Sequence, residues 1–117
     1  MSTRATVHFG SQNADGKFTK QAIVYRHHDG YPAGLGKDLK TFLEEVKKTC
    51  PDTRFYDPCY LAAKFVVWQA DQYANKDNKL DFLSLGVCLE DPSDIEYRYL
   101  VICDFKCDMP KVRMRHV

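Results

Sequence analysis

The sequence has no long hydrophobic run and almost no net charge. No stretch approaches the ~20 apolar residues that a membrane-spanning helix needs, and the N-terminal MSTRATVHFG lacks the apolar core of a secretory signal. We therefore expect a cytoplasmic protein with no membrane partner. Lys and Arg number 17 against 16 Asp and Glu. This balance disfavours a protein that coats nucleic acid, but a small anionic ligand needs only two or three cations in one place.

The sequence also lacks a disulfide framework, internal repeats and low-complexity segments. Its five cysteines are odd in number and follow no framework spacing, so we expect reduced thiols that pack as small buried hydrophobes. With 117 residues, 44% apolar and 28% charged, the chain fits one globular domain with one core, residues 1–117.

Motifs for catalysis, cofactors and metals are absent or incomplete. The pair Gly36-Lys37 lacks the rest of a phosphate-binding loop, because Tyr31 stands where its first glycine belongs. His27 and His28 are neighbours on a predicted strand and point to opposite faces, so they do not easily share one metal ion. We expect no enzyme, no cofactor and no metal site, with His27 or His28 as a general base the enzymatic alternative.

The hydrophobic pattern predicts six elements. Period-two alternation around Asp15-Gly16 indicates a hairpin over residues 6–28. Apolar residues at helical spacing predict a helix over 35–50, which Pro51 ends, and a second over 58–73 with Asp57 as N-cap. This second helix is apolar on most of its circumference, so we expect it to be buried on more than one side, with Trp68 in the core. Residues 81–90 and 95–105 read as strands.

This order, β-β-α-α-β-β, predicts an α+β fold in which a four-stranded antiparallel sheet carries both helices on one face. By alternation, we expect the other face to mix apolar and charged residues, which is typical of an interface. A homo-oligomer, at least a dimer, follows from this expectation. The residues expected on the open face are Val24, Arg26, His28, Arg98, Leu100, Ile102 and Asp104.

The corner between the first hairpin and the first helix has the strongest features of a site. Backbone N–H groups at a helix start attract anions, glycines let a ligand approach, and a guanidinium suits a phosphate. The alternative is a purely structural corner in which Gly30 and Pro32 form a tight turn and Asp29 caps it. The predicted ligand-binding set comprises Tyr25, Arg26, His28, Asp29, Gly30, Tyr31, Gly34, Gly36, Lys37, Arg54 and Arg98.

The segment YRHHDGYPAGLGKDL, with TVHFG before it and YRYLVICDF after the helices, resembles a group of small phage and prophage proteins with a Y-R-H-x-D-G-Y-P-x-G-x-G motif. The layout is similar to that of Thoeris anti-defence sponges, which oligomerise and hold a cyclic ADP-ribose-type immune signal without cleaving it. The resemblance implies a binding protein that sequesters a nucleotide-derived signal in an infected bacterial host. The alternative is a protein-binding inhibitor of a bacterial defence complex, of the anti-CRISPR kind.

Overall fold

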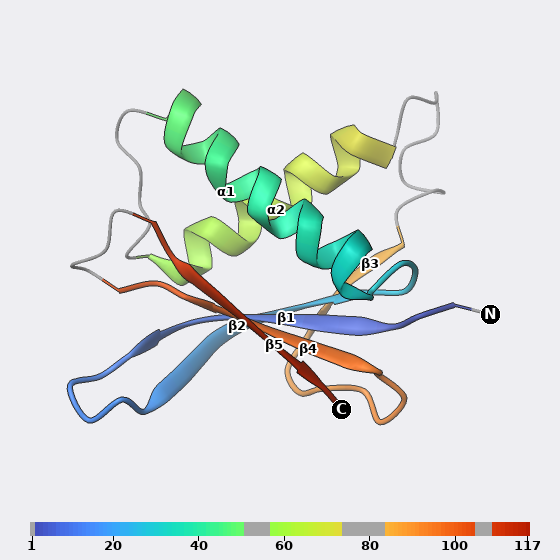
Figure 1. Cartoon of the computed structure of the whole chain (residues 1–117), viewed down its shortest axis with the longest axis horizontal. Coiled ribbons are helices and arrows are strands. Elements are labelled where there is room, and N and C mark those ends of the chain that lie inside the picture. Colours follow the sequence, from blue (N-terminus) through green and yellow to red (C-terminus); the bar gives the residue numbers. More distant parts are fainter. Residues whose placement is uncertain (1, 51–56, 74–83, 105–108) are drawn as a thin grey trace.

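In the part of the chain that the structure describes, five strands form one mixed sheet, and two helices lie on the same face of it (Figure 1). The computed structural model describes residues 2–50, 57–73, 84–104 and 109–117. Neither described helix has the length and apolar composition that a bilayer crossing requires. The strands are β1 (Ala5–Gln12), β2 (Phe18–Arg26), β3 (Leu85–Cys88), β4 (Tyr97–Ile102) and β5 (Lys111–His116), and the helices are α1 (Lys37–Thr49) and α2 (Pro58–Tyr73), with a π-helical turn η1 (Pro32–Gly36) before α1.

The predicted hairpin is confirmed. β1 and β2 pair antiparallel from Ala5 opposite Arg26 to Gln12 opposite Phe18. Gly16 takes a φ of +82° in the turn, a conformation that glycine adopts without a steric penalty. Local signals therefore indicate this hairpin: period-two alternation on both sides of a turn in which glycine takes a positive φ.

The α+β class is confirmed, but the predicted four-stranded antiparallel sheet is wrong. The strand order is β3-β2-β1-β4-β5, and the pair β1–β4 is parallel. β3 and β4 do not form a hairpin, because the chain between them passes from the β2 edge to the far side of β1. The fifth strand, β5, comes from the basic tail that carried no predicted element. Residues 81–83 of the predicted third strand lie outside the described residues.

The core lies between the helices and the sheet. The predicted stripe of the first helix is confirmed, with Leu39, Phe42, Leu43 and Val46 all buried. The Phe65 ring of α2 contacts Phe42 and Phe9, at centroid distances of 5.2 and 5.8 Å. Full burial of such side chains stabilises the fold by about 1.5–3 kcal/mol each.

The structure bears on three further predictions: the cap of α2, the burial of α2 and the burial of the cysteines. Asp57 caps α2 as predicted, because its Oδ1 accepts the N–H of Tyr60 at 3.4 Å. α2 was expected to be buried on more than one side; Leu61, Ala62 and Phe65 are buried, whereas Val67 is 64% exposed. The expected burial of the cysteines holds for Cys103, whose thiol pKa burial raises to about 12, whereas Cys59 is exposed.

The face assigned to β2 by alternation is wrong. Val7 pairs with both Val24 and Tyr99, and directly opposite residues share a face. Val24 and Arg26 therefore point toward the helices, where they are 2% and 3% exposed. Ile23 and Val24 are both apolar, so alternation in this strand gives no clue to which side is inside.

The face of β4 is predicted correctly, with Arg98, Leu100 and Ile102 opposite the helices. We call this side of the sheet the open face. Ile102 is nevertheless only 2% exposed in a single chain, and Leu100 is half-buried. The apolar area that motivated an oligomer is therefore smaller than the sequence indicates, and the oligomer stays a prediction.

Candidate anion-binding site

Arg26 holds the predicted corner together from the inside. Its Nε donates a hydrogen bond to the carbonyl oxygen of His28 at 2.8 Å. Its Nη1 donates to Asp38 Oδ2 at 2.6 Å and to Gln69 Oε1 at 2.9 Å. The guanidinium therefore joins the end of β2 to α1 and α2, and these donors point into the protein.

The turn after Arg26 satisfies its own backbone. Asp29 takes a φ of +56°, and its carbonyl oxygen accepts the N–H of Leu35 at 2.8 Å. A Cβ atom on Gly34 would lie 2.4 Å from that same carbonyl oxygen. The N–H of Lys37, at the start of α1, donates to carbonyl oxygens of η1. These contacts are what the structural-corner alternative requires.

Tyr99 of β4 links the sheet to the corner. Its hydroxyl donates to the carbonyl oxygen of Gly30 at 2.7 Å. Burial raises the pKa of Tyr99 to about 12, so the phenol is a neutral donor at physiological pH. Gly36 lies against this ring, where an added Cβ would be 3.4 Å from Tyr99 Cε2.

The remaining predicted residues of the corner lie apart from its interior. Tyr31 is 40% exposed and donates to Asp29 Oδ1 at 3.2 Å, and the charge of Asp29 raises the pKa of Tyr31. His28 is exposed and forms a hydrogen bond between its Nδ1 and Ser2 Oγ at 2.9 Å. Arg54 lies outside the described residues.

The predicted set is thus divided between the two faces of the sheet. Arg26 points toward the helices, whereas Tyr25 and Arg98 lie on the open face. The expectation that Arg26 and Arg98 share a face is corrected by the pairing of β2. Tyr25 interacts there with His27, with its hydroxyl 2.7 Å from His27 Nδ1.

The open face has its own cationic pocket, of about 430 Å³, at the strands β1, β4 and β5. Arg115 lies directly opposite Arg98 in the ladder, and Arg113 lies opposite Leu100. His8 of β1 is the next neighbour of Leu100 on the other side. The residues that line the pocket are His8, Arg98, Leu100, Arg113, Met114 and Arg115.

One carboxylate orders the inner wall of this cationic pocket. Asp91 accepts hydrogen bonds from Thr6 Oγ1 at 2.6 Å, His8 Nε2 at 2.7 Å and Arg98 Nε at 2.7 Å. Burial by itself raises the pKa of Asp91, but these hydrogen bonds outweigh burial and the net pKa is lowered. Asp91 is therefore ionised, and it fixes the Arg98 guanidinium through Nε.

The charge balance of the cationic pocket is positive. Asp91 offsets one of its three arginines. Among the described residues, Arg113 and Arg115 have no ion-pair or hydrogen-bonding side-chain partner. No serine or cysteine lines the pocket, and the described residues contain no group of His, Cys, Asp or Glu that could hold a metal ion. The arrangement is suited to holding an anion by charge-assisted hydrogen bonds.

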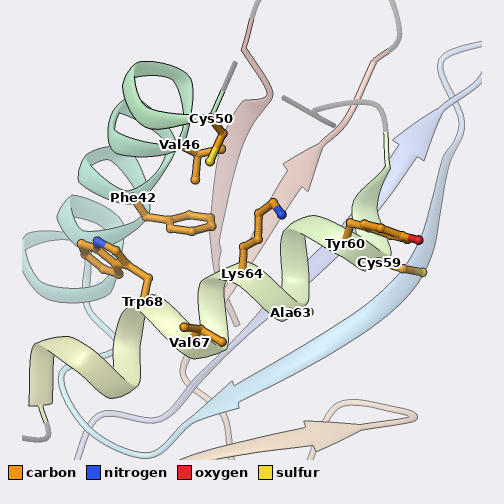
Figure 2. A pocket seen from close by; sticks show the side chains of 9 residues that line it. All are labelled: Phe42, Val46, Cys50, Cys59, Tyr60, Ala63, Lys64, Val67 and Trp68. Carbon is orange, nitrogen blue, oxygen red and sulfur yellow. The ribbon is translucent and has the colours of Figure 1, made fainter. Parts of the chain in front are cut away.

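A second hollow, of about 650 Å³, lies between α1 and α2 and is apolar (Figure 2). We call it the helix groove. Trp68 stands at its rim: its ring is 5.7 Å from Phe42, and its Nε1 donates to Glu45 Oε2 at 2.6 Å. Trp68 is thus half-buried and not a central core residue. Figure 2 shows the lining residues Phe42, Val46, Cys50, Cys59, Tyr60, Ala63, Lys64, Val67 and Trp68.

Arg113, Arg115 and His8 were not predicted as site residues. The segment KVRMRH does carry a signal, because cations alternate with Val112 and Met114 at the period of a strand. Because three of its six residues are cations, the segment also fits a solvated tail, and this makes the alternation hard to recognise. No family model, curated protein or solved structure matches this chain.

Proposed function

We propose that the protein binds a small, nucleotide-derived anion and sequesters it without changing it. The observation that carries this proposal is the cationic pocket, in which three arginines from two paired strands converge and Asp91 fixes one of them. Guanidinium groups pair with phosphate in a bidentate geometry. Two of the arginines have no partner among the described residues, so an anion there replaces water and not a protein carboxylate.

The size of the cationic pocket suits a ligand with one or two phosphates. Its 430 Å³ lies within the range of about 300–1,000 Å³ for small-molecule sites. Leu100 adds apolar surface beside the arginines. The resemblance to anti-defence sponges gives the proposal its specific form, a cyclic ADP-ribose-like immune signal held in the cytoplasm of an infected host, with homo-oligomerisation as a further expectation.

The test is direct binding by isothermal titration calorimetry. ADP-ribose, cyclic ADP-ribose and pyrophosphate are the probes, and adenosine is the uncharged control. We expect Arg113→Gln and Arg115→Gln each to weaken binding about 10- to 100-fold, from the loss of a charge-assisted hydrogen bond worth about 1.5–3 kcal/mol. Lys40→Gln, an equal charge change at an exposed position on α1, should alter affinity less than twofold.

The fate of the ligand separates a binding protein from an enzyme. Ligand released by heating the complex should be chemically intact by mass spectrometry. A converted ligand would mean catalysis, and no binding of any anionic probe would refute the proposal.

The helix groove favours a second candidate function, inhibition of a protein complex. It is apolar, and Val67 and Tyr60 beside it are 64% and 51% exposed. Suppression of bacterial defence by Val67→Asp and by Arg115→Gln distinguishes the two candidates. Loss of suppression only with Val67→Asp supports the inhibitor, and loss only with Arg115→Gln supports ligand sequestration.

A further inference from the structure

Strand β5 lies at an edge of the sheet, and none of the described residues pairs with its outer side. All six of its residues are exposed. The N–H of Val117 donates to the carbonyl oxygen of Glu96 at 2.7 Å, which fixes the alternation of the ladder with β4. The N–H and C=O groups of Lys111, Arg113 and Arg115 therefore face β4, and those of Val112, Met114 and His116 face outward.

The side chains of β5 divide by charge between the two faces of the sheet. Val112 and Met114 lie opposite Val101 and Tyr99, on the helix side, where they are 38% and 46% exposed. The three cations Lys111, Arg113 and Arg115 lie on the open face. The edge therefore presents backbone hydrogen-bonding groups between a cationic row and a short apolar row.

We propose that this edge docks an extended segment of another protein, in which acidic residues alternate with apolar ones. Such a strand would continue the sheet through backbone hydrogen bonds to β5. Its carboxylates would lie beside the cationic row and its apolar side chains beside Val112 and Met114, and opposite charges across a strand pair are stabilising. This proposal does not depend on the small ligand of the cationic pocket.

The charge pattern disfavours a second copy of this chain as the occupant. In a two-fold antiparallel pairing of β5 with itself, the axis is perpendicular to the sheet, so each side chain keeps its face. Lys111, Arg113 and Arg115 of both copies would then lie together on one face. Like charges directly opposite each other destabilise a strand pair. An acidic strand is the occupant that the same geometry favours.

The experiment uses the full chain and a short fluorescein-labelled peptide that alternates glutamate and valine. We expect the anisotropy to rise on binding and the affinity to fall as salt is added, since the charges are exposed. A peptide of equal composition with its glutamates and valines in separate blocks, and one with lysine for glutamate, should bind at least tenfold more weakly. Equal binding of the block peptide would overturn the proposal, because charge alone would then explain it.

A proline on β5 tests the backbone pairing. Val112→Pro removes an N–H that faces outward and keeps the ladder bonds with β4, so we expect at least a tenfold loss of peptide affinity, whereas Val112→Ala should keep most of it. If Val112→Pro does not fold, N-methylation of alternate peptide residues blocks the same bonds from the partner side. Undiminished binding of the N-methylated peptide would overturn the proposal. Pyrophosphate binding, measured in parallel with the folded variants, reports separately on the cationic pocket.

Discussion

Replacing Arg26 by alanine removes the side chain that joins β2 to both helices. Three acceptors then lose a donor: the His28 carbonyl oxygen, Asp38 Oδ2 and Gln69 Oε1. Arg26 is 3% and Gln69 0% exposed, so water does not replace the guanidinium at Gln69 without a rearrangement. We expect Arg26→Ala to destabilise the fold strongly.

The magnitude follows from how far each partner of Arg26 is buried. Removing one member of a fully buried ion pair costs about 3–5 kcal/mol. The Asp38 side chain is 31% exposed, so water partly solvates its carboxylate after the substitution and lowers this figure. The orphaned Gln69 adds about 1–3 kcal/mol. A loss of about 3–4 kcal/mol in the free energy of unfolding is the expected result, or about 12–16 °C in Tm.

Urea unfolding measures this loss, with the single tryptophan, Trp68, as the fluorescent probe. Arg26→Lys is the conservative comparison: it keeps the charge but not the three-donor fork, and we expect roughly half the loss. Exposed Lys40→Ala serves as the control and should change the unfolding free energy by less than about 0.5 kcal/mol. An Arg26→Ala variant as stable as the wild type would refute the structural role, and the corner would again be a candidate for ligand contact.

Four further substitutions test the corner and the open face. Gly34→Ala places a Cβ 2.4 Å from the Asp29 carbonyl oxygen and should cost about 1–3 kcal/mol by urea unfolding. Gly36→Ala, whose Cβ would lie 3.4 Å from Tyr99 Cε2, should cost less. Because the pKa of Asp91 is lowered in the folded protein, its ionisation stabilises the fold above the ordinary aspartate pKa of about 4. This stability is lost as pH falls through the folded-state pKa, so Asp91→Asn should remove this part of the acid unfolding profile. The raised pKa of Tyr99, about 12, contributes stability that is present below pH 10 and lost as pH rises toward 12, so Tyr99→Phe should flatten the alkaline limb of the unfolding free energy.

Local elements of this chain are predictable because their causes lie within a few residues of each other. The hairpin needs only alternation and a turn glycine, and α1 needs only apolar residues at helical spacing. Asp57 and Pro58 mark the start of α2 by the same local logic. In each case the signal and the structure it specifies occupy the same stretch of sequence.

The sheet order and the buried arginine depend on contacts between distant residues. The two side-chain acceptors of Arg26 lie 12 and 43 positions away, and no pattern around Arg26 indicates that helices supply them. Whether β4 pairs parallel or antiparallel depends on the path of the chain after β3, which local alternation does not encode. The cationic pocket was missed for this reason, since Arg98 and Arg115 become neighbours only when β4 and β5 pair.

The nearly neutral composition and the cationic open face are compatible because the structure separates the charges. Asp38 pairs with Arg26 on the helix side, and Asp91 is held by Thr6, His8 and Arg98, so neither carboxylate neutralises β5. Net charge therefore says little about whether the protein can bind an anion. The electrostatic field near Arg113 and Arg115 depends on which carboxylates already pair with other residues.

Because the Arg113 and Arg115 side chains are exposed, salt should weaken the binding of any anion there, whether a phosphate in the cationic pocket or a carboxylate on a docked strand. Backbone hydrogen bonds to β5 are insensitive to screening by salt. If the alternating peptide still binds at high salt, and Val112→Pro still abolishes this binding, the remaining affinity comes from backbone pairing at the strand edge.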